Sequence, residues 1–202
     1  MNSQQCMNEV LSCELVAMAD EDFAVRDELV ADGSLAIHGY HPRMEAVHKK
    51  NAARLAAIIE QHGWPIISLV GEKGAWAAWL IAQHDIGEPA FMRQCLALLK
   101  RAAENKEIEP WQVAMMEDRI RIFEGKQQVY GTQFEPNAQG EFVPYPIEDL
   151  AGVNERRLEV GLNTLEERAA EMNAQRASEN VPMPPDAETQ YLKWVYAVGW
   201  RS

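Results

Sequence analysis

The sequence predicts a mainly α-helical protein: a single-domain, bundle-like core of about five to seven helices, with a small β-hairpin near residues 127–146. Three observations lead to this fold class. Apolar residues recur every three or four positions over long stretches. Prolines and glycines stand where helices would begin and end. A β-prone stretch with a central turn follows Gly125.

The first predicted helix covers residues 8–31. Its apolar residues are spaced by three, four and seven positions, which is typical of one face of an amphipathic helix. The Asp32-Gly33 pair is expected to end this helix. The apolar stripe consists of Leu11, Leu15, Met18, Val25 and Leu29.

The next three segments lead to the centre of the predicted core. Residues 43–61 form a second amphipathic helix, which Gly63 is expected to end. Residues 62–74, HGWPIISLVGEKG, are interrupted by proline and glycine and predict a buried connection with room for a short extended stretch. Residues 75–84, AWAAWLIAQH, are apolar on all sides, as expected of a central helix.

Two further helices are expected to begin at Pro89 and Pro110, because proline suits the first helical turn. The second of them ends at Gly125. Beyond it, two β-prone runs flank the turn-rich PNAQG at residues 136–140, which predicts the hairpin. Two prolines confine its second arm to a sheet edge.

The domain prediction divides the chain near residue 163. Residues 1–163 form a helical core domain that holds a polar cluster. Residues 164–202 contain a charged helix, a Pro-rich linker at residues 178–186 and an aromatic C-terminal segment. Exposed aromatic patches are uncommon on monomers, so we expect this segment to dock on the same domain.

Composition limits the classes of partner. The chain has 19 Lys and Arg against 31 Asp and Glu, and its net charge of -12 opposes nonspecific binding to nucleic acid or to an anionic membrane. Cys6, Cys13 and Cys95 lack the spacing of a disulfide framework or zinc knuckle. Without a signal peptide or a membrane-spanning run, the protein is expected to be cytoplasmic. A small-molecule ligand, a protein partner or a homo-oligomer remains open.

Polar residues fall on the apolar faces of several predicted helices. In the first helix, Asp22 and Arg26 lie inside the apolar stripe and, being four apart, can pair. In the second helix, three polar residues lie within roughly 40° of Leu55 at about 100° per residue. In the central helix, two more must be buried or line a cavity. These five residues are His48, Asn51, His62, Gln83 and His84.

The helix that begins at Pro110 carries an acid and a base in its centre. Asp118 falls on one apolar stripe and Arg119 on another, so each is directed into apolar surroundings. Because isolated buried charges are costly, Asp118 needs donors, and Arg119 needs a carboxylate or a bound anion. The simplest expectation is that the inward polar groups of these four segments meet one another.

Four strings occur in an order that resembles an uncharacterised bacterial domain-of-unknown-function family, numbered 6624. They are HGWP at 62–65, LIAQH at 80–84, DRIRIFEGKQQVYGTQF at 118–134 and NERRLEVGL at 154–162. The resemblance covers roughly residues 15–162 and brings no established activity. It implies motif positions at Asp22, Arg26, Asn51, Gln83, His84, Asp118, Arg119, Tyr130, Gly131, Thr132 and Gln133. The chain departs from the pattern at His48, where an acidic residue is expected, and at Phe23, where a glutamine is expected.

Each candidate also has a structural explanation. Asp22 and Arg26 are equally well explained as an ion pair between helices. His48 alone fits a hydrogen-bonded core histidine, whereas His84 fits a site residue better because Gln83 beside it adds to the cost of burial. The YGTQ string is either a loop over a pocket or a turn. The segment NERRLEV is expected to be a solvated helix face, and Cys95, Trp64, Trp76 and Trp79 are expected in the core.

No cofactor or metal is predicted. His48, His84 and Asp118 would make a two-histidine, one-carboxylate metal face, but no local ligand spacing such as HExxH supports it. The motifs GxSxG, GxGxxG and Walker A do not occur in the chain.

Two functions fit the sequence. The first is binding of a small polar or anionic ligand in a buried polar pocket, with acid–base chemistry in which Asp118 or Asp22 orients His84. Arg119 and Arg26 would hold the ligand. The catalytic set is His84, Asp118 and Arg119, and the ligand-binding set is Asp22, Arg26, His48, Asn51, Gln83, Tyr130, Thr132 and Gln133. The alternative is a non-catalytic interaction or immunity-like protein that uses its acidic surface and aromatic C-terminus.

Overall fold

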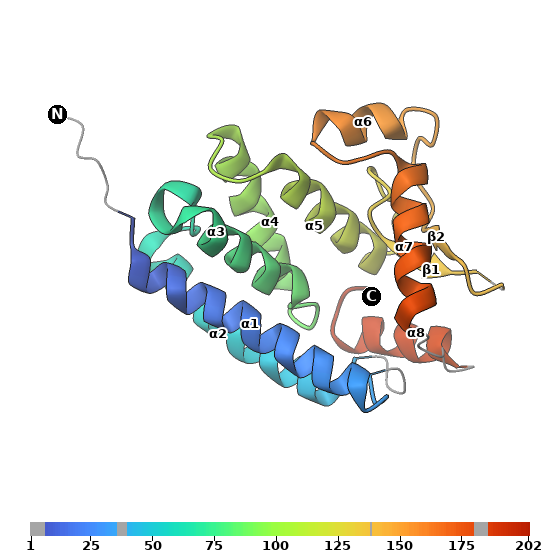
Figure 1. Cartoon of the computed structure of the whole chain (residues 1–202), viewed down its shortest axis with the longest axis horizontal. Helices are drawn as coiled ribbons and strands as arrows, with labels where there is room; N and C mark the ends of the chain where they lie inside the picture. The colour runs from blue at the N-terminus through green and yellow to red at the C-terminus, as the bar shows by residue number, and fades with distance from the viewer. Residues whose placement is uncertain (1–6, 36–39, 138, 180–185) are drawn as a thin grey trace. The chain divides into compact units, whose positions relative to one another are not determined.

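A computed structural model describes residues 7–35, 40–137, 139–179 and 186–202 (Figure 1). The predicted mainly helical class with a small hairpin is confirmed, although eight helices occur in the described part because three helices follow the hairpin. None of these helices combines the length and apolar character that crossing a membrane requires. The helices are α1 (Glu9–Ala31), α2 (Pro42–His62), α3 (Ile67–His84), α4 (Pro89–Glu104), α5 (Pro110–Phe123), α6 (Val153–Glu159), α7 (Leu165–Glu179) and α8 (Ala187–Ala197), and the strands are β1 (Phe134–Pro136) and β2 (Phe142–Pro144).

The chain groups into two compact units, Met1–Ile108 and Glu109–Ser202. This grouping divides the chain at a different place from the division that the sequence suggests near residue 163. Some predicted features lie outside the described residues: Cys6, residues 36–39 of the loop after the first helix, Ala138 in the hairpin turn and residues 180–185 of the linker.

In the first unit, α1 packs against α2 and α3, and α3 also packs against α4. The side chain of Asn8 caps α1 by accepting a hydrogen bond of 3.0 Å from the backbone N–H of Leu11. Proline occupies the first turn of α2 and of α4, where its missing N–H has no cost. The core of the unit includes the fully buried side chains of Leu15, Leu55, Val70, Met92 and Leu99.

The prediction of a connection without helical structure at residues 62–74 is corrected, because α3 begins within this segment. The helix begins at Ile67, and Gly71, with φ 71° and ψ 172°, interrupts it after one turn. Gly71 therefore does mark an interruption of the helix, but the residues before it are helical. Two further expectations are wrong, because His62 is exposed and Trp76 is 38% exposed instead of lying in the core.

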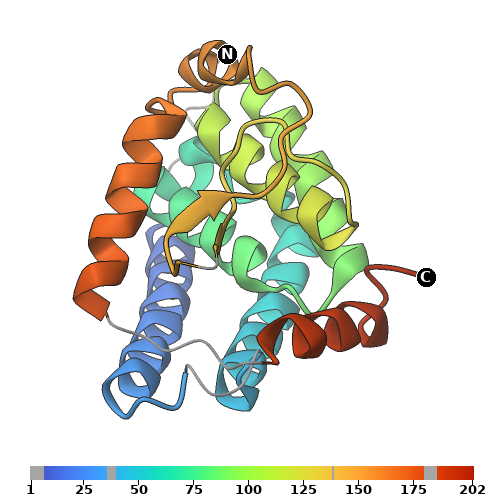
Figure 2. The ribbon, with the colours of Figure 1, turned by 90° about the vertical axis from the view of Figure 1, so that its right-hand side faces the viewer.

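The second unit is built around α5, the hairpin and α6–α8 (Figure 2). β1 and β2 pair antiparallel, with Phe134 opposite Pro144. α7 packs against β2, and the Asn173 side chain bonds both the N–H and the C=O of Phe142, at 2.7 and 3.0 Å. Phe123 of α5 lies in ring contact with aromatic side chains near the C-terminus, which are Tyr191, Trp194 and Trp200.

Candidate functional site

Three helices of the first unit direct one titratable side chain each to a common point. Asp22 of α1 is 1% exposed. Its Oδ2 lies 2.7 Å from Nδ1 of His84, the last residue of α3, and its Oδ1 lies 3.3 Å from Nε2 of His48 in α2. We call these three residues the Asp22 cluster. Helical periodicity places Asp22 and His48 on the apolar faces of their helices, as the sequence predicts.

Tyr40 fixes the position of His48. Its hydroxyl lies 2.8 Å from His48 Nδ1, and the two rings stack with centroids 5.6 Å apart. Burial raises the pKa of Tyr40 far above its usual value, so the hydroxyl keeps its proton. When Tyr40 donates this proton to His48 Nδ1, the proton of the neutral imidazole lies on Nε2 and is donated to Asp22.

His84 is the most accessible member of the Asp22 cluster. Its side chain is 24% exposed, against 9% for His48 and 2% for Asp22. Because Asp22 accepts a hydrogen bond from Nδ1–H of His84, the lone pair of the neutral ring lies on Nε2. The Asp22 carboxylate thus fixes the orientation and the tautomer of the His84 imidazole.

The charge of Asp22 follows from its partners. Burial alone would raise the pKa of the Asp22 carboxyl, but hydrogen bonds from His48 and His84 outweigh burial and hold this pKa well below its usual range. Asp22 is therefore ionised at neutral pH. The donor atoms of Asp22, His48 and His84 lie within 4.8 Å of one another, which makes these residues able to hold a metal ion.

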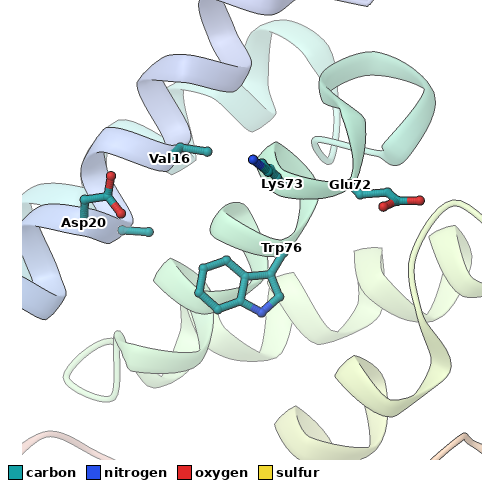
Figure 3. Close-up of a pocket in the computed structure, with 6 residues that line it drawn as sticks. Val16, Asp20, Glu72, Lys73 and Trp76 are labelled. Atoms are coloured by element: carbon teal, nitrogen blue, oxygen red, sulfur yellow. The ribbon is translucent and has the colours of Figure 1, made fainter.

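A pocket of about 350 Å³ lies between α1 and α3 (Figure 3). Phe23 connects it to the Asp22 cluster, because the Phe23 ring stacks on Trp76 of the pocket at 6.2 Å and meets the His84 ring edge-on at 6.5 Å. Its lining combines apolar and charged side chains. It is lined by Val16, Ala19, Asp20, Glu72, Lys73 and Trp76.

Other polar residues of these helices differ in their partners. Asn51 donates a hydrogen bond of 2.9 Å to the backbone carbonyl of Met18, so it ties α2 to α1, and Gln83 is buried in α3. Asp85, which sequence reasoning missed, is fully buried, and neither carboxylate oxygen has a hydrogen-bond partner among the described residues. Burial raises its pKa to about 7. The sequence feature that could have indicated the burial of Asp85 is its position directly after the buried Gln83-His84 pair.

Asp118 belongs to a different arrangement in the second unit. Its carboxylate accepts backbone N–H groups of Val129, Tyr130 and Thr132 at 2.7, 3.2 and 3.0 Å. Burial raises the pKa of Asp118, although these hydrogen bonds act in the opposite direction. Asp118 thus holds the turn that contains YGTQ, which we call the 128–133 loop.

Two buried side chains that sequence reasoning missed complete this support. Arg157, expected on a solvated helix face, is 1% exposed and donates to the carbonyls of Tyr130 and Gly131 at 2.8 and 3.1 Å. Gln128 donates to the carbonyl of Gln133 at 3.0 Å and accepts the N–H of the same residue at 2.9 Å. Gly131 has φ +66°, and a Cβ atom there would lie 2.8 Å from the side chains of both Ile147 and Leu165.

Arg119 lies beside the 128–133 loop. Its Nε donates a hydrogen bond of 3.2 Å to the side-chain oxygen of Gln133, whose amide nitrogen in turn lies 3.0 Å from the Thr132 hydroxyl. Burial lowers the pKa of Arg119 to about 10, so the guanidinium stays charged at neutral pH. Asp118 and Arg119 thus bond different residues of the same 128–133 loop.

The predicted site residues form two groups. Asp22, His48 and His84 meet in the first unit, and Asp118, Arg119, Tyr130, Thr132 and Gln133 meet in the second. One predicted pairing is corrected: the described partners of the Asp22 carboxylate are the two histidines, while Arg26 lies 3.8 Å from Asp27. The sequence offers Asp118 or Asp22 as the carboxylate that orients His84, and the one beside His84 is Asp22.

Comparison of the chain with curated proteins and with solved structures found no match. A family model does match, and its match extends past the resemblance drawn from the motifs at both ends. Because residues 9–177 match the model of DUF6624, a family of unknown function, the chain belongs to that family.

Proposed function

We propose that the Asp22 cluster binds a small polar molecule and transfers a proton to or from it through His84. The observation that carries this proposal is the hydrogen bond of 2.7 Å between His84 Nδ1 and Asp22 Oδ2. A carboxylate in this position sets the tautomer and orientation of an imidazole and stabilises the imidazolium that forms when Nε2 accepts a proton.

The other members of the cluster support this role. His48 neutralises part of the Asp22 charge by its own hydrogen bond and is itself positioned by Tyr40. Because Asp22 is buried, its interaction with an imidazolium is weakly screened by water. The pocket lined by Trp76 offers space for a small molecule, and the ring of Phe23 contacts both Trp76 and His84.

We propose a smaller catalytic set than the one that the sequence suggests. Asp118 and Arg119 are engaged in holding the 128–133 loop, so the proposal assigns proton transfer to His84 with Asp22 as its orienting group. The alternative interaction function has less support, because three aromatic side chains of the C-terminal segment lie in ring contact with Phe123 and only Tyr196, at 54%, is largely exposed among the four. Trp200 is 3% exposed and contacts Phe123.

A thermal-shift screen of small polar compounds tests the proposal. We expect at least one compound to raise the melting temperature of the wild type but not of His84→Gln. His62→Gln is the matched control, because His62 is an exposed histidine of α2. If such a compound is turned over, His84→Gln is expected to lower kcat by about 100-fold or more. Compounds that stabilise the wild type and His84→Gln equally would contradict the proposal.

A further inference from the structure

We infer that the Asp22 cluster is also a reversible binding site for a divalent transition-metal ion, best matched by Zn²⁺, and that the bound ion blocks proton transfer at His84. The second half of this inference rests on the proposed function, whereas the first half stands on the geometry of the donor atoms.

The donor set is that of a metal site with an open position. Two imidazole nitrogens and a carboxylate come from three separate helices, and their donor atoms lie within 4.8 Å of one another. A tetrahedral Zn²⁺ ion with bonds of about 2.0–2.2 Å places its ligand atoms roughly 3.3 Å apart. His84 Nδ1 lies 2.7 Å from Asp22 Oδ2, and His48 Nε2 lies 3.3 Å from Asp22 Oδ1, so each ring faces a different oxygen of the carboxylate. To enclose an ion, the three side chains must shift until their donor atoms reach the tetrahedral spacing.

The donor types favour some ions over others. Imidazole nitrogen is a good ligand for Zn²⁺, whereas Mg²⁺ and Ca²⁺ prefer sites composed of oxygen. The buried Asp22 carboxylate supplies a negative charge that compensates part of the charge of the ion. Three protein ligands leave one position of a tetrahedral ion for water or a small molecule.

Tyr40 can form a hydrogen bond with His48 both when Nε2 of His48 binds an ion and when it does not. Without an ion, the Tyr40 hydroxyl donates to His48 Nδ1 at 2.8 Å. With an ion on Nε2, the ring proton moves to Nδ1, and the same hydroxyl can accept it because a hydroxyl both donates and accepts. A hydrogen bond to the other nitrogen of a ligating histidine orients the ring, and its loss typically costs about 10–100-fold in metal affinity.

Ion binding and proton transfer exclude each other at His84. The hydrogen bonds within the cluster are complete without an ion, so an ion must replace the two that the histidines give to Asp22. An ion on Nδ1 of His84 forces the ring proton onto Nε2, and that nitrogen can then no longer accept a proton. Binding is therefore expected to be reversible and to weaken as pH falls, since protons compete for the ring nitrogens.

Isothermal titration of the chelator-treated full-length chain with Zn²⁺ at pH 7 tests the site. Cys6 and Cys13 are first replaced by serine to remove thiol ligands that are unrelated to the cluster. We expect the parent chain to bind one equivalent of Zn²⁺. The affinity for Zn²⁺ is expected to fall more than about 100-fold in His48→Ala and in His84→Ala, and about 10–100-fold in Tyr40→Phe. His62→Ala is expected to match the parent, and Mg²⁺ or Ca²⁺ to leave the cluster unoccupied.

Nitrogen NMR of the histidine rings tests the site in the parent chain, so the result does not depend on whether the variants fold. In the parent chain, Zn²⁺ is expected to shift the signals of His48 Nε2 and His84 Nδ1 and to leave those of His62 unchanged. Absence of stoichiometric binding, or binding that persists in His84→Ala, would overturn the metal site.

The blocking effect is tested with a compound from the thermal-shift screen that depends on His84. We expect Zn²⁺ to weaken its binding. If the compound binds equally with and without bound Zn²⁺, the blocking claim is wrong. Compound binding without any Zn²⁺ binding overturns the metal site and leaves the proposed function intact. If Zn²⁺ binds but no compound depends on His84, the proposed function is overturned and the metal site stands.

Discussion

Asp22 and Asp118 are both buried aspartates on apolar helix faces, but their partners differ in kind. Asp22 accepts hydrogen bonds from the rings of His48 and His84, which can gain and lose protons. Asp118 accepts hydrogen bonds from backbone N–H groups of the 128–133 loop, which cannot. Burial of a carboxylate therefore does not distinguish a scaffold from a site. The chemistry of its partners does.

This difference changes what each aspartate contributes. A carboxylate that binds several backbone N–H groups fixes one conformation of a loop, and its removal leaves buried donors without acceptors. A carboxylate that binds two imidazoles sets their tautomers and their affinity for protons or metal ions. We therefore expect substitutions at Asp118 to affect mainly stability, and substitutions in the Asp22 cluster to affect ligand binding and pH dependence.

The largest stability effect is expected at Asp118. Asp118→Ala leaves the N–H groups of Val129, Tyr130 and Thr132 without their acceptor, and we expect a loss of about 3–5 kcal/mol in the free energy of unfolding. Urea unfolding measures the loss, and hydrogen exchange at the three amides locates it. Glu155→Ala, at an exposed position of α6, is the control. Unchanged protection of these amides would show that Asp118 does not hold the loop.

Asp85 sharpens the comparison, because the structure describes no hydrogen-bond partner for its buried carboxylate. Its pKa of about 7 is raised above the unfolded value of about 3.9, so the folded state binds more protons in this range and stability falls as pH rises from about 4 to 7. Asp85→Asn is expected to stabilise the protein by about 2–4 kcal/mol at pH 8 and by little at pH 4. A variant that is less stable than the wild type at pH 8 would reveal a favourable partner of the ionised Asp85.

The pH dependence of Asp22 has the opposite sign. Because the pKa of Asp22 is lowered in the folded state, its contribution is fully present above the unfolded pKa of about 3.9 and is lost as pH falls toward the folded value. At pH 7, Asp22→Asn is expected to cost about 2–3 kcal/mol, the scale of hydrogen bonds to a charged group. The midpoints of urea unfolding of the wild type and Asp22→Asn should approach each other as pH falls below 4. A difference that stays constant down to pH 3 would argue against an ionised Asp22.

The smallest effect is expected at Tyr40. Tyr40→Phe removes one neutral hydrogen bond to His48 and keeps the stacked ring, so we expect a loss of about 0.5–1.5 kcal/mol. Nitrogen NMR of His48 provides a more specific readout. Its ring should change tautomer populations in Tyr40→Phe, while that of His62 should not. An unchanged His48 spectrum would exclude Tyr40 as its positioning group.

Sequence periodicity predicts the helices and the inward direction of Asp22, His48, Asp118 and Arg119, because both depend on local backbone geometry. It does not predict which inward groups meet. That depends on how neighbouring helices are aligned, which a single sequence does not specify. For this reason the sequence leaves Asp118 and Asp22 as alternatives for the carboxylate beside His84, and only the packing of the helices shows that it is Asp22.

Other errors have local causes. Arg157 lies in a charged run that looks solvated, and only the loop carbonyls that it binds explain its burial. Trp76 was expected in the core because tryptophan is mostly apolar, yet it stacks on Phe23 at the pocket. Gly71 marked a real break, but its neighbours are helical on both sides.

NMR mapping of a bound compound tests most directly whether the Asp22 cluster is a site and the Asp118 arrangement a scaffold. The isotope-labelled chain is titrated with a compound selected in the thermal-shift screen, and shifts are followed at Asp22, His48 and His84 and along the 128–133 loop. We expect the largest saturable shifts at the three cluster residues and none in the loop. Saturable shifts confined to the 128–133 loop would contradict the assignment of the two regions.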